Sequence, residues 1–230
     1  MNDIGFTGAD YSAILLSIKV ASTATLLSLP FAFMTAYIMT FRKFRGKIAL
    51  DVLTNLPLTL PPVVIGYLLL ILLGQQGLIG KILLQSLGIK LIFTWKAAVI
   101  ATSVVGFPLM VRSIRTAMEG IDERLVQVSR LLGARMLDRI ITVILPLSIR
   151  GIIAGSALMF ARGLGEFGAT VIVAGNIPGI TQTIPLAIYD YASSPKGDAM
   201  ALMLCTVSIT ISVIVLVFYE WLGKRVVRKD

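Results

Sequence analysis

The sequence predicts an all-α integral membrane protein of one domain, residues 1–230, with five transmembrane helices and a short cytoplasmic segment. Hydrophobic residues make up 57% of the 230 positions and charged residues only 14%, and the mean hydropathy is +0.90. A soluble domain carries about 25% charged residues. Charge-free stretches close to the ~20 residues that cross a bilayer as a helix recur along the chain, and the basic residues gather in alternate connections between them.

The expected spans are bounded by charged residues and contain several prolines. They cover residues 13–40, 50–74, 92–113, 150–174 and 199–220. In the second span, Pro57, Pro61 and Pro62 each lack a backbone donor and clash with the preceding helical turn, so we expect this helix to bend or break. In the third, Gly106 and Pro108 predict a bend.

The fourth span allows two placements, which differ in the position of its charges. A helix over 140–161 puts Arg150 in the middle of the bilayer. A helix over 150–174 puts Arg150 at the interface, where its long side chain can reach the headgroups, and puts Arg162 near the midplane. Because Pro146 would disrupt the earlier placement, we expect the span 150–174.

The basic residues of the connections indicate the orientation of the chain. They gather in the first connection, in the third connection and in the tail: Arg42, Lys43, Arg45 and Lys47; Arg112, Arg115, Arg124, Arg130, Arg135 and Arg139; Lys224, Arg225, Arg228 and Lys229. The positive-inside rule therefore predicts an outside N-terminus and a cytoplasmic C-terminus. This segregation makes the net charge of +9 a sign of topology, and it argues against nucleic-acid binding.

Several classes of site are disfavoured by composition. The chain has no histidine, which removes His-based acid–base catalysis and His-ligated metals, and its one cysteine, Cys205, forms no internal disulfide framework. The buried reactive groups expected, Glu166, Asp51 and Cys205, include no nucleophile–base pair. The stretch GQQGLIGKI has one residue too many for a P-loop and Ile82 in place of Ser or Thr. We expect no catalytic residue, no metal site and no cofactor bound by this chain.

The cytoplasmic segment, residues 119–146, has an amphipathic pattern that a simple connection between two spans does not need. Apolar residues recur at helical spacing along it: Ile121, Leu125, Val128 and Leu132. Gly133 suits the left-handed residue that ends a helix, and a second short helix is expected over 135–143. The segment is either an amphipathic loop folded against its own membrane domain or a docking element for a cytoplasmic partner.

The stretch ARGLGEFGAT, residues 161–170, places two opposite charges within the fourth span. At positions i and i+4, Arg162 and Glu166 share a helix face. The pair either neutralises itself and only holds the bundle together, or lines or gates a transport pathway, as charges within membranes often do. The small residues Gly163, Gly165 and Gly168 favour the second reading because they allow close approach or bending.

The cytoplasmic segment resembles the signature of ABC-importer permeases. That signature has three residues, three spacers, a glycine, nine more residues and an aliphatic-x-Leu-Pro, and here Gly133 and Leu145-Pro146 fit it. The family usually has Glu-Ala-Ala where this chain has Gln-Val-Ser. The resemblance implies coupling helices that fit a cleft on an ATPase subunit, and it assigns to this coupling Gln127, Val128, Ser129, Arg130, Gly133, Ala134 and Arg135.

The resemblance covers nearly the whole chain. LPLTLPPVVIGYLLL, GFPLMVRSIRTAMEGID, ARGLGEFGAT and GNIPGITQTIP are together similar to molybdate permease subunits. This similarity implies a type I ABC importer permease fold in a prokaryotic plasma membrane. It also implies two copies around a common pathway, a cytoplasmic ATPase dimer that binds ATP and Mg, and an extracytoplasmic molybdate-binding protein.

Two alternatives stay open at this point. Sulfate, thiosulfate and tungstate permeases of the same class carry similar dianions, which the sequence does not separate from molybdate. An ATP-independent anion channel or carrier is the alternative from another class, and the amphipathic segment around Gly133 argues against it.

Overall fold

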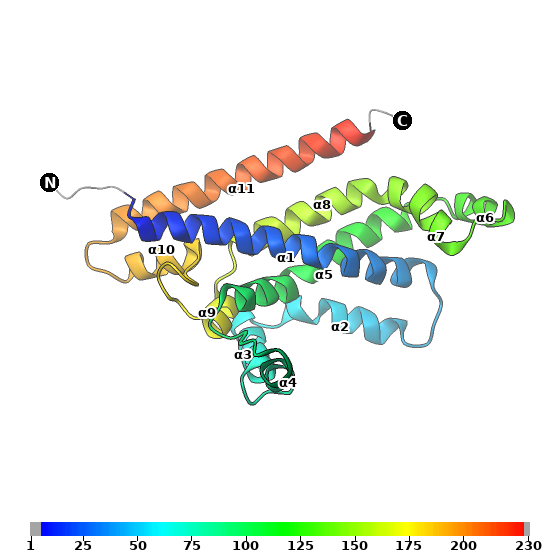
Figure 1. The fold of residues 1–230 in the computed structure, drawn as a ribbon. Coiled ribbons are helices and arrows are strands. Elements are labelled where there is room, and N and C mark those ends of the chain that lie inside the picture. The colour runs from blue at the N-terminus through cyan, green and yellow to red at the C-terminus, as the bar shows by residue number, and fades with distance from the viewer. Residues whose placement is uncertain (1–5, 228–230) are drawn as a thin grey trace.

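The computed structural model describes residues 6–227, which fold into helices without any strand. In chain order the elements are α1 (Gly8–Phe41), α2 (Lys47–Thr59), α3 (Pro62–Leu73), α4 (Leu78–Leu87), α5 (Trp95–Glu119), α6 (Glu123–Leu131), α7 (Met136–Arg139), the π-helical turn η1 (Ile140–Ile144), α8 (Leu145–Leu164), α9 (Gly168–Ala174), α10 (Ile184–Ala192) and α11 (Asp198–Val227). The start of α1 lies at one end of an elongated bundle, whereas the end of α11 points to the other end, where α6 and α7 lie (Figure 1). The all-α prediction is confirmed.

The described residues contain four helical stretches long and apolar enough to span a membrane. These are α1, α5, the continuous stretch Met136–Leu164 and the part of α11 over Asp198–Gly223. The pair α2 and α3 passes the same test together, which gives up to five spans, but it bends by 113°. The bend lies at Leu60-Pro61-Pro62, since a residue before proline is pushed toward extended backbone, and Leu60 has ψ 143°. The expected break at these prolines is confirmed.

The fourth span differs from the helix expected over 150–174. Its helix starts at Met136, runs through Pro146 and ends at Leu164, and α9 follows as a separate short helix. The π-helical turn η1 precedes Pro146, and in it the N–H of Leu145 donates to the carbonyl of Ile140. Pro146 lies inside this continuous helix, and the π-helical turn before it accommodates the missing N–H and the ring. The helix therefore passes the proline and is interrupted later, at residues 165–167.

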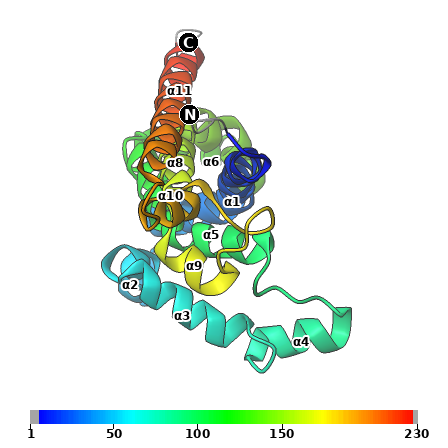
Figure 2. The ribbon, with the colours of Figure 1, turned by 90° about the vertical axis from the view of Figure 1, so that its left-hand side faces the viewer.

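Alanines let the central helices approach closely. Those fully buried in α1 and α5 are Ala21, Ala24, Ala32, Ala36, Ala97, Ala98 and Ala101. Because lipid tails are as apolar as leucine, helices in membranes associate through such close van der Waals contact. Around the central group of α1, α5 and α8, helix α11 lies at one edge against α8 and α10, and α3 and α4 project away on the opposite side (Figure 2).

Polar contacts tie α10 to the beginning of α1. The N–H of Ile184 donates to Oγ of Ser17 at 2.7 Å, and the hydroxyl of Tyr191 donates to Oδ1 of Asp10 at 2.9 Å. Desolvation by burial and the bond to Asp10 raise the pKa of Tyr191, which keeps its hydroxyl protonated as the donor to Asp10. These contacts fix the end of the bundle opposite to α6.

Candidate functional site

Arg162 and Glu166 lie at the interruption between α8 and α9. Arg162 is in the last turn of α8, and Glu166 directly precedes Phe167, the N-cap residue of α9. Nη1 of Arg162 is 2.8 Å from Oε2 of Glu166, and the two side chains are 32% and 1% exposed. The expected shared face of one helix is wrong, because α8 ends at Leu164, and the contact instead forms across the end of the helix.

Each charge also compensates a helix end. A helix carries partial negative charge at its C-terminus and partial positive charge at its N-terminus. Arg162 stands at the C-terminal end of α8, and Oε1 of Glu166 accepts a hydrogen bond from the N–H of Ala169 in the first turn of α9 at 2.8 Å. Oε1 therefore has a hydrogen-bond donor, whereas Oε2 has the ionic contact with Arg162 and no hydrogen bond from the described residues. The two charges stabilise the break in the helix as well as each other.

The first two glycines of the motif have contrasting surroundings. A Cβ added to Gly163 would lie 2.7 Å from Cγ2 of Thr102 and 3.3 Å from Cβ of Ala21, so Gly163 fills the contact of α8 with α5 and α1. A Cβ added to Gly165 would meet only the carbonyl oxygen of Arg162, at 3.9 Å. Gly163 is thus required by packing, whereas Gly165 borders open space.

This contrast predicts different effects of adding one methyl group. We expect Gly163→Ala to lower the free energy of unfolding by about 1–3 kcal/mol, because it overpacks a three-helix contact. Gly165→Ala should change it by less than about 1 kcal/mol. Thermal unfolding of both variants in one detergent measures the difference, and equal melting temperatures would contradict the packing role of Gly163.

The third glycine lies where the two interrupted helices meet. A Cβ added to Gly168 would lie 3.1 Å from Cβ of Pro62 and 3.2 Å from Cγ2 of Val63. One turn further along, a Cβ added to Gly66 would lie 2.8 Å from the backbone of Ala169. The break between α2 and α3 is therefore packed directly against the break between α8 and α9.

The segment α6–α7 has the expected helix α6 and its glycine end, but the separate short helix expected over 135–143 is wrong, because α7 and η1 continue into α8 as one helix. Asp122 is the N-cap of α6, and its carboxylate accepts from the N–H of Arg124 at 2.9 Å. Gly133 has φ 83°, the left-handed conformation that suits glycine after a helix. The N–H of Ala134 donates to the carbonyl of Ser129 at 3.1 Å, and the N–H of Arg135 donates to Oδ2 of Asp138 at 3.0 Å.

The remaining residues assigned to coupling lie on α6, where none is fully buried. Val128 is half exposed, Gln127 and Arg130 are at least partly exposed, and the hydroxyl of Ser129 donates to the carbonyl of Val126 at 2.8 Å. The most exposed apolar residues of the segment were not assigned from the sequence: Leu131 at 86%, Leu132 at 82% and Leu137 at 70%. Only Leu132 belonged to the predicted stripe. The segment therefore presents an apolar surface that its own membrane domain leaves uncovered.

A second polar site lies between α2 and α5, and the sequence did not indicate its pairing. Nη1 of Arg115 is 2.9 Å from Oδ1 of Asp51, and its Nε is 2.7 Å from Oε1 of Glu119. Asn55 donates to Oδ1 of Asp51 at 3.2 Å. Asp51, Asn55 and Arg115 border a cavity of about 340 Å³ that Arg112 also lines. Sixty-four positions separate Asp51 from Arg115, so no local pattern could reveal the contact.

Comparison with known proteins decides the family of the chain. Residues 28–228 match the family described as binding-protein-dependent transport system inner membrane component. The chain belongs to this family of membrane transport components.

Other members of the family are similar over almost their whole length. The molybdenum transport system permease protein ModB of Escherichia coli K12 is 48% identical over 218 residues, which are 95% of each chain. ModB of Haemophilus influenzae is 47% identical over 220 residues, 96% of each chain. A putative molybdenum transport system permease protein of Bacillus subtilis, YvgM, is 39% identical over 201 residues, 87% of this chain and 88% of the relative.

Solved structures confirm the fold of this family member at lower sequence identity. The inward-facing MetNI methionine ABC transporter superposes with a TM-score of 0.71 at 12% identity, over 95% of this chain and 94% of that one. A bacterial alginate ABC transporter, solved with an alginate pentasaccharide-bound periplasmic protein, gives 0.73 at 15% identity, over 96% and 80%. The predicted type I ABC importer permease fold is confirmed, and the chain is a multi-pass membrane protein.

Proposed function

We propose that this chain is the permease subunit of an ATP-driven importer of molybdate. The observation that carries the proposal is the 48% identity to a molybdenum transport permease over 95% of both chains. The type I importer fold is the second support. In this function molybdate is the transported anion. The chain supplies the transport pathway and the contact with the ATPase that drives transport. ATP and Mg bind to the partner ATPase, because the P-loop-like stretch in this chain departs from the motif.

Two copies of the chain form the passage in this proposal. One chain offers up to five spans, about half of the usual permease helices, and a two-fold axis would bring a second set against the first. An extracytoplasmic molybdate-binding protein delivers the anion, in keeping with the description of the family as binding-protein-dependent. A cytoplasmic ATPase dimer completes the assembly.

The chain is oriented with its N-terminus outside and its C-terminus in the cytoplasm of a prokaryotic plasma membrane. The basic connections support this orientation. The end of α11 and the helices α6 and α7 lie at the same end of the bundle (Figure 1), so a cytoplasmic C-terminus agrees with a cytoplasmic coupling segment. At that end, the uncovered Leu131 and Leu132 suit a contact with the ATPase.

The helix breaks mark the part of the chain that would line or gate the pathway. In transporters, interrupted helices often meet near the midplane and form the substrate site. Here the breaks of α2–α3 and α8–α9 pack together around Gly168, beside the pair Arg162–Glu166. Arg162, partly exposed, offers a positive charge to a passing dianion, and Glu166 limits the strength of that attraction. Gly165 borders open space at this point, whereas Gly163 keeps the supporting helices close.

Transport in a reconstituted system tests the proposal. We expect proteoliposomes with this chain, its ATPase and its binding protein to accumulate molybdate only with ATP, and to do so in excess sulfate. Uptake that excess sulfate abolishes would assign the chain to the sulfate and thiosulfate permeases. Excess tungstate, supplied separately, tests for a tungstate permease. Uptake without ATP would indicate a channel or carrier and would contradict the importer.

A further inference from the structure

A crevice opens between α8 and the C-terminal part of α11. Its volume is about 580 Å³. The two helices run antiparallel along it (Figure 1), so residues late in α11 face residues early in α8. The deeper lining is apolar and consists of Ile153, Ala154, Ala157, Leu158 and Leu216. A crevice of this composition, open at the side of a membrane bundle, suits an acyl chain.

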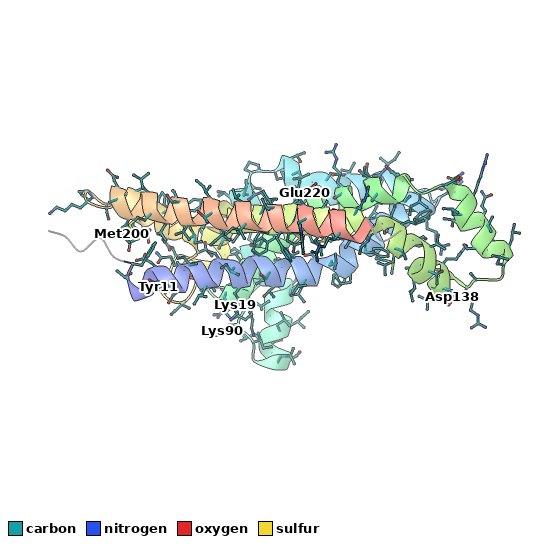
Figure 3. All side chains as sticks on the ribbon, turned by 90° about the horizontal axis from the view of Figure 1, so that it is seen from above. Tyr11, Lys19, Lys90, Asp138, Met200 and Glu220 are labelled. Carbon is teal, nitrogen blue, oxygen red and sulfur yellow. The ribbon has the colours of Figure 1, made fainter. Side chains whose placement is uncertain are left out.

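The other end of the crevice is polar and holds opposite charges on its two walls. Arg150 on α8 and Glu220 on α11 both line it, together with Tyr219 and Gly223. Figure 3 shows Glu220 on the last part of α11. In the sequence, the apolar run of α11 gives way to basic residues directly after Gly223, at Lys224 and Arg225. Glu220 therefore lies close to the end of the α11 span, and Arg150 lies on the opposite wall of the crevice, on α8.

Aromatic and basic side chains lie next to Glu220 along α11. Trp221 stacks with Phe218, with ring centroids 6.2 Å apart, and the guanidinium of Arg225 lies 4.0 Å from the centre of the Trp221 ring. Tryptophan and tyrosine are enriched at the membrane–water interface. This second set of residues places the crevice mouth at the interface independently of the position of Arg150.

We propose that the crevice binds a phospholipid with both a phosphate and a primary amine in its headgroup, such as phosphatidylethanolamine. The guanidinium of Arg150 pairs with the phosphate. The carboxylate of Glu220 accepts from the ammonium, and with about four lone-pair sites it can do so while it contacts another group. The acyl chain lies along Ile153, Ala157 and Leu216.

The acidic wall determines which headgroup fits. Basic pockets between membrane helices select anionic lipids, but Glu220 would repel the headgroup of phosphatidylglycerol, which has no cation to compensate the phosphate. The quaternary ammonium of phosphatidylcholine has no N–H and donates no hydrogen bond to a carboxylate. An amine-bearing headgroup is the one that can pair with Arg150 through its phosphate and with Glu220 through its ammonium.

Native mass spectrometry of the purified chain, taken from nanodiscs with equal parts of the three lipids, tests the inference. We expect phosphatidylethanolamine to be retained about tenfold over phosphatidylcholine, since charged hydrogen bonds differ between them. Arg150→Gln should abolish the retention. Glu220→Gln should remove the preference and raise the retention of phosphatidylglycerol. As matched controls, Arg124→Gln and Glu123→Gln on α6, which do not line the crevice, should leave the lipid ratio unchanged.

Three results would overturn the inference. The first is equal retention of the three lipids by the unaltered chain, and the second is a preference that survives both Arg150→Gln and Glu220→Gln. The third is cross-linking between two copies through a cysteine introduced by Leu216→Cys in a Cys205→Ser background, because a second copy would then cover the crevice. Each result is independent of which anion the assembly transports.

Discussion

Arg162→Met should abolish transport and destabilise the chain more than Glu166→Gln does. The carboxylate of Glu166 is 1% exposed and pairs with Arg162 on one oxygen, so removal of the guanidinium strands a buried charge. Breaking a buried pair in this way costs about 3–5 kcal/mol. In Glu166→Gln the amide oxygen can still accept from the N–H of Ala169, and the charge left on Arg162 is one third exposed.

The double variant distinguishes the effect of a stranded charge on stability from a role of the two charges in transport. Arg162→Met with Glu166→Gln leaves no stranded charge, so we expect its melting temperature to exceed that of Arg162→Met alone. Uptake by all three variants, measured in the same proteoliposomes, then shows whether the charges also act in transport. If the double variant is stable and inactive, the pair functions in the pathway. Normal uptake by all three would contradict that role.

The sequence predicted those features that local spacing determines. The left-handed Gly133 follows from the end of an amphipathic stripe, whereas the contact of Arg162 with Glu166 forms across a helix end that the i,i+4 spacing did not predict. The bend at Pro61-Pro62 follows from the backbone restriction before a proline. In each case the physical cause lies within one or two helical turns of the residue concerned.

Features that depend on contacts between distant segments were not predictable in the same way. Pro146 is tolerated because a π-helical turn precedes it, and no composition signal distinguishes this turn from a regular helix. The interruption of α8–α9 is stabilised by Glu166 at the start of α9 and by contacts of Gly168 with Pro62. The three glycines around Glu166 could have indicated a break there. That this break packs against Pro62, at the break between α2 and α3, was known only from the structure.

Leu131→Ser and Leu132→Ser should each weaken binding of the partner ATPase without destabilising the isolated chain. Both leucines are more than 80% exposed, so the isolated chain loses almost no packing. In the proposed complex, burial of each leucine contributes about 1.5–3 kcal/mol, and its loss should lower affinity by about tenfold or more. Titration of the ATPase into the detergent-solubilised chain measures the affinity, and thermal unfolding of the chain alone measures its stability.

Leu87→Ser is the matched control, because Leu87 is 64% exposed and ends α4, in a connection that the proposed topology places outside. It should leave ATPase affinity unchanged. A lower melting temperature in Leu131→Ser with unchanged ATPase affinity would mean that the segment packs on its own membrane domain, which is the other reading of its amphipathic pattern. If the leucines contact the ATPase, their substitution lowers ATPase affinity and leaves the stability of the chain unchanged. If they pack on the membrane domain of their own chain, their substitution lowers stability and leaves ATPase affinity unchanged.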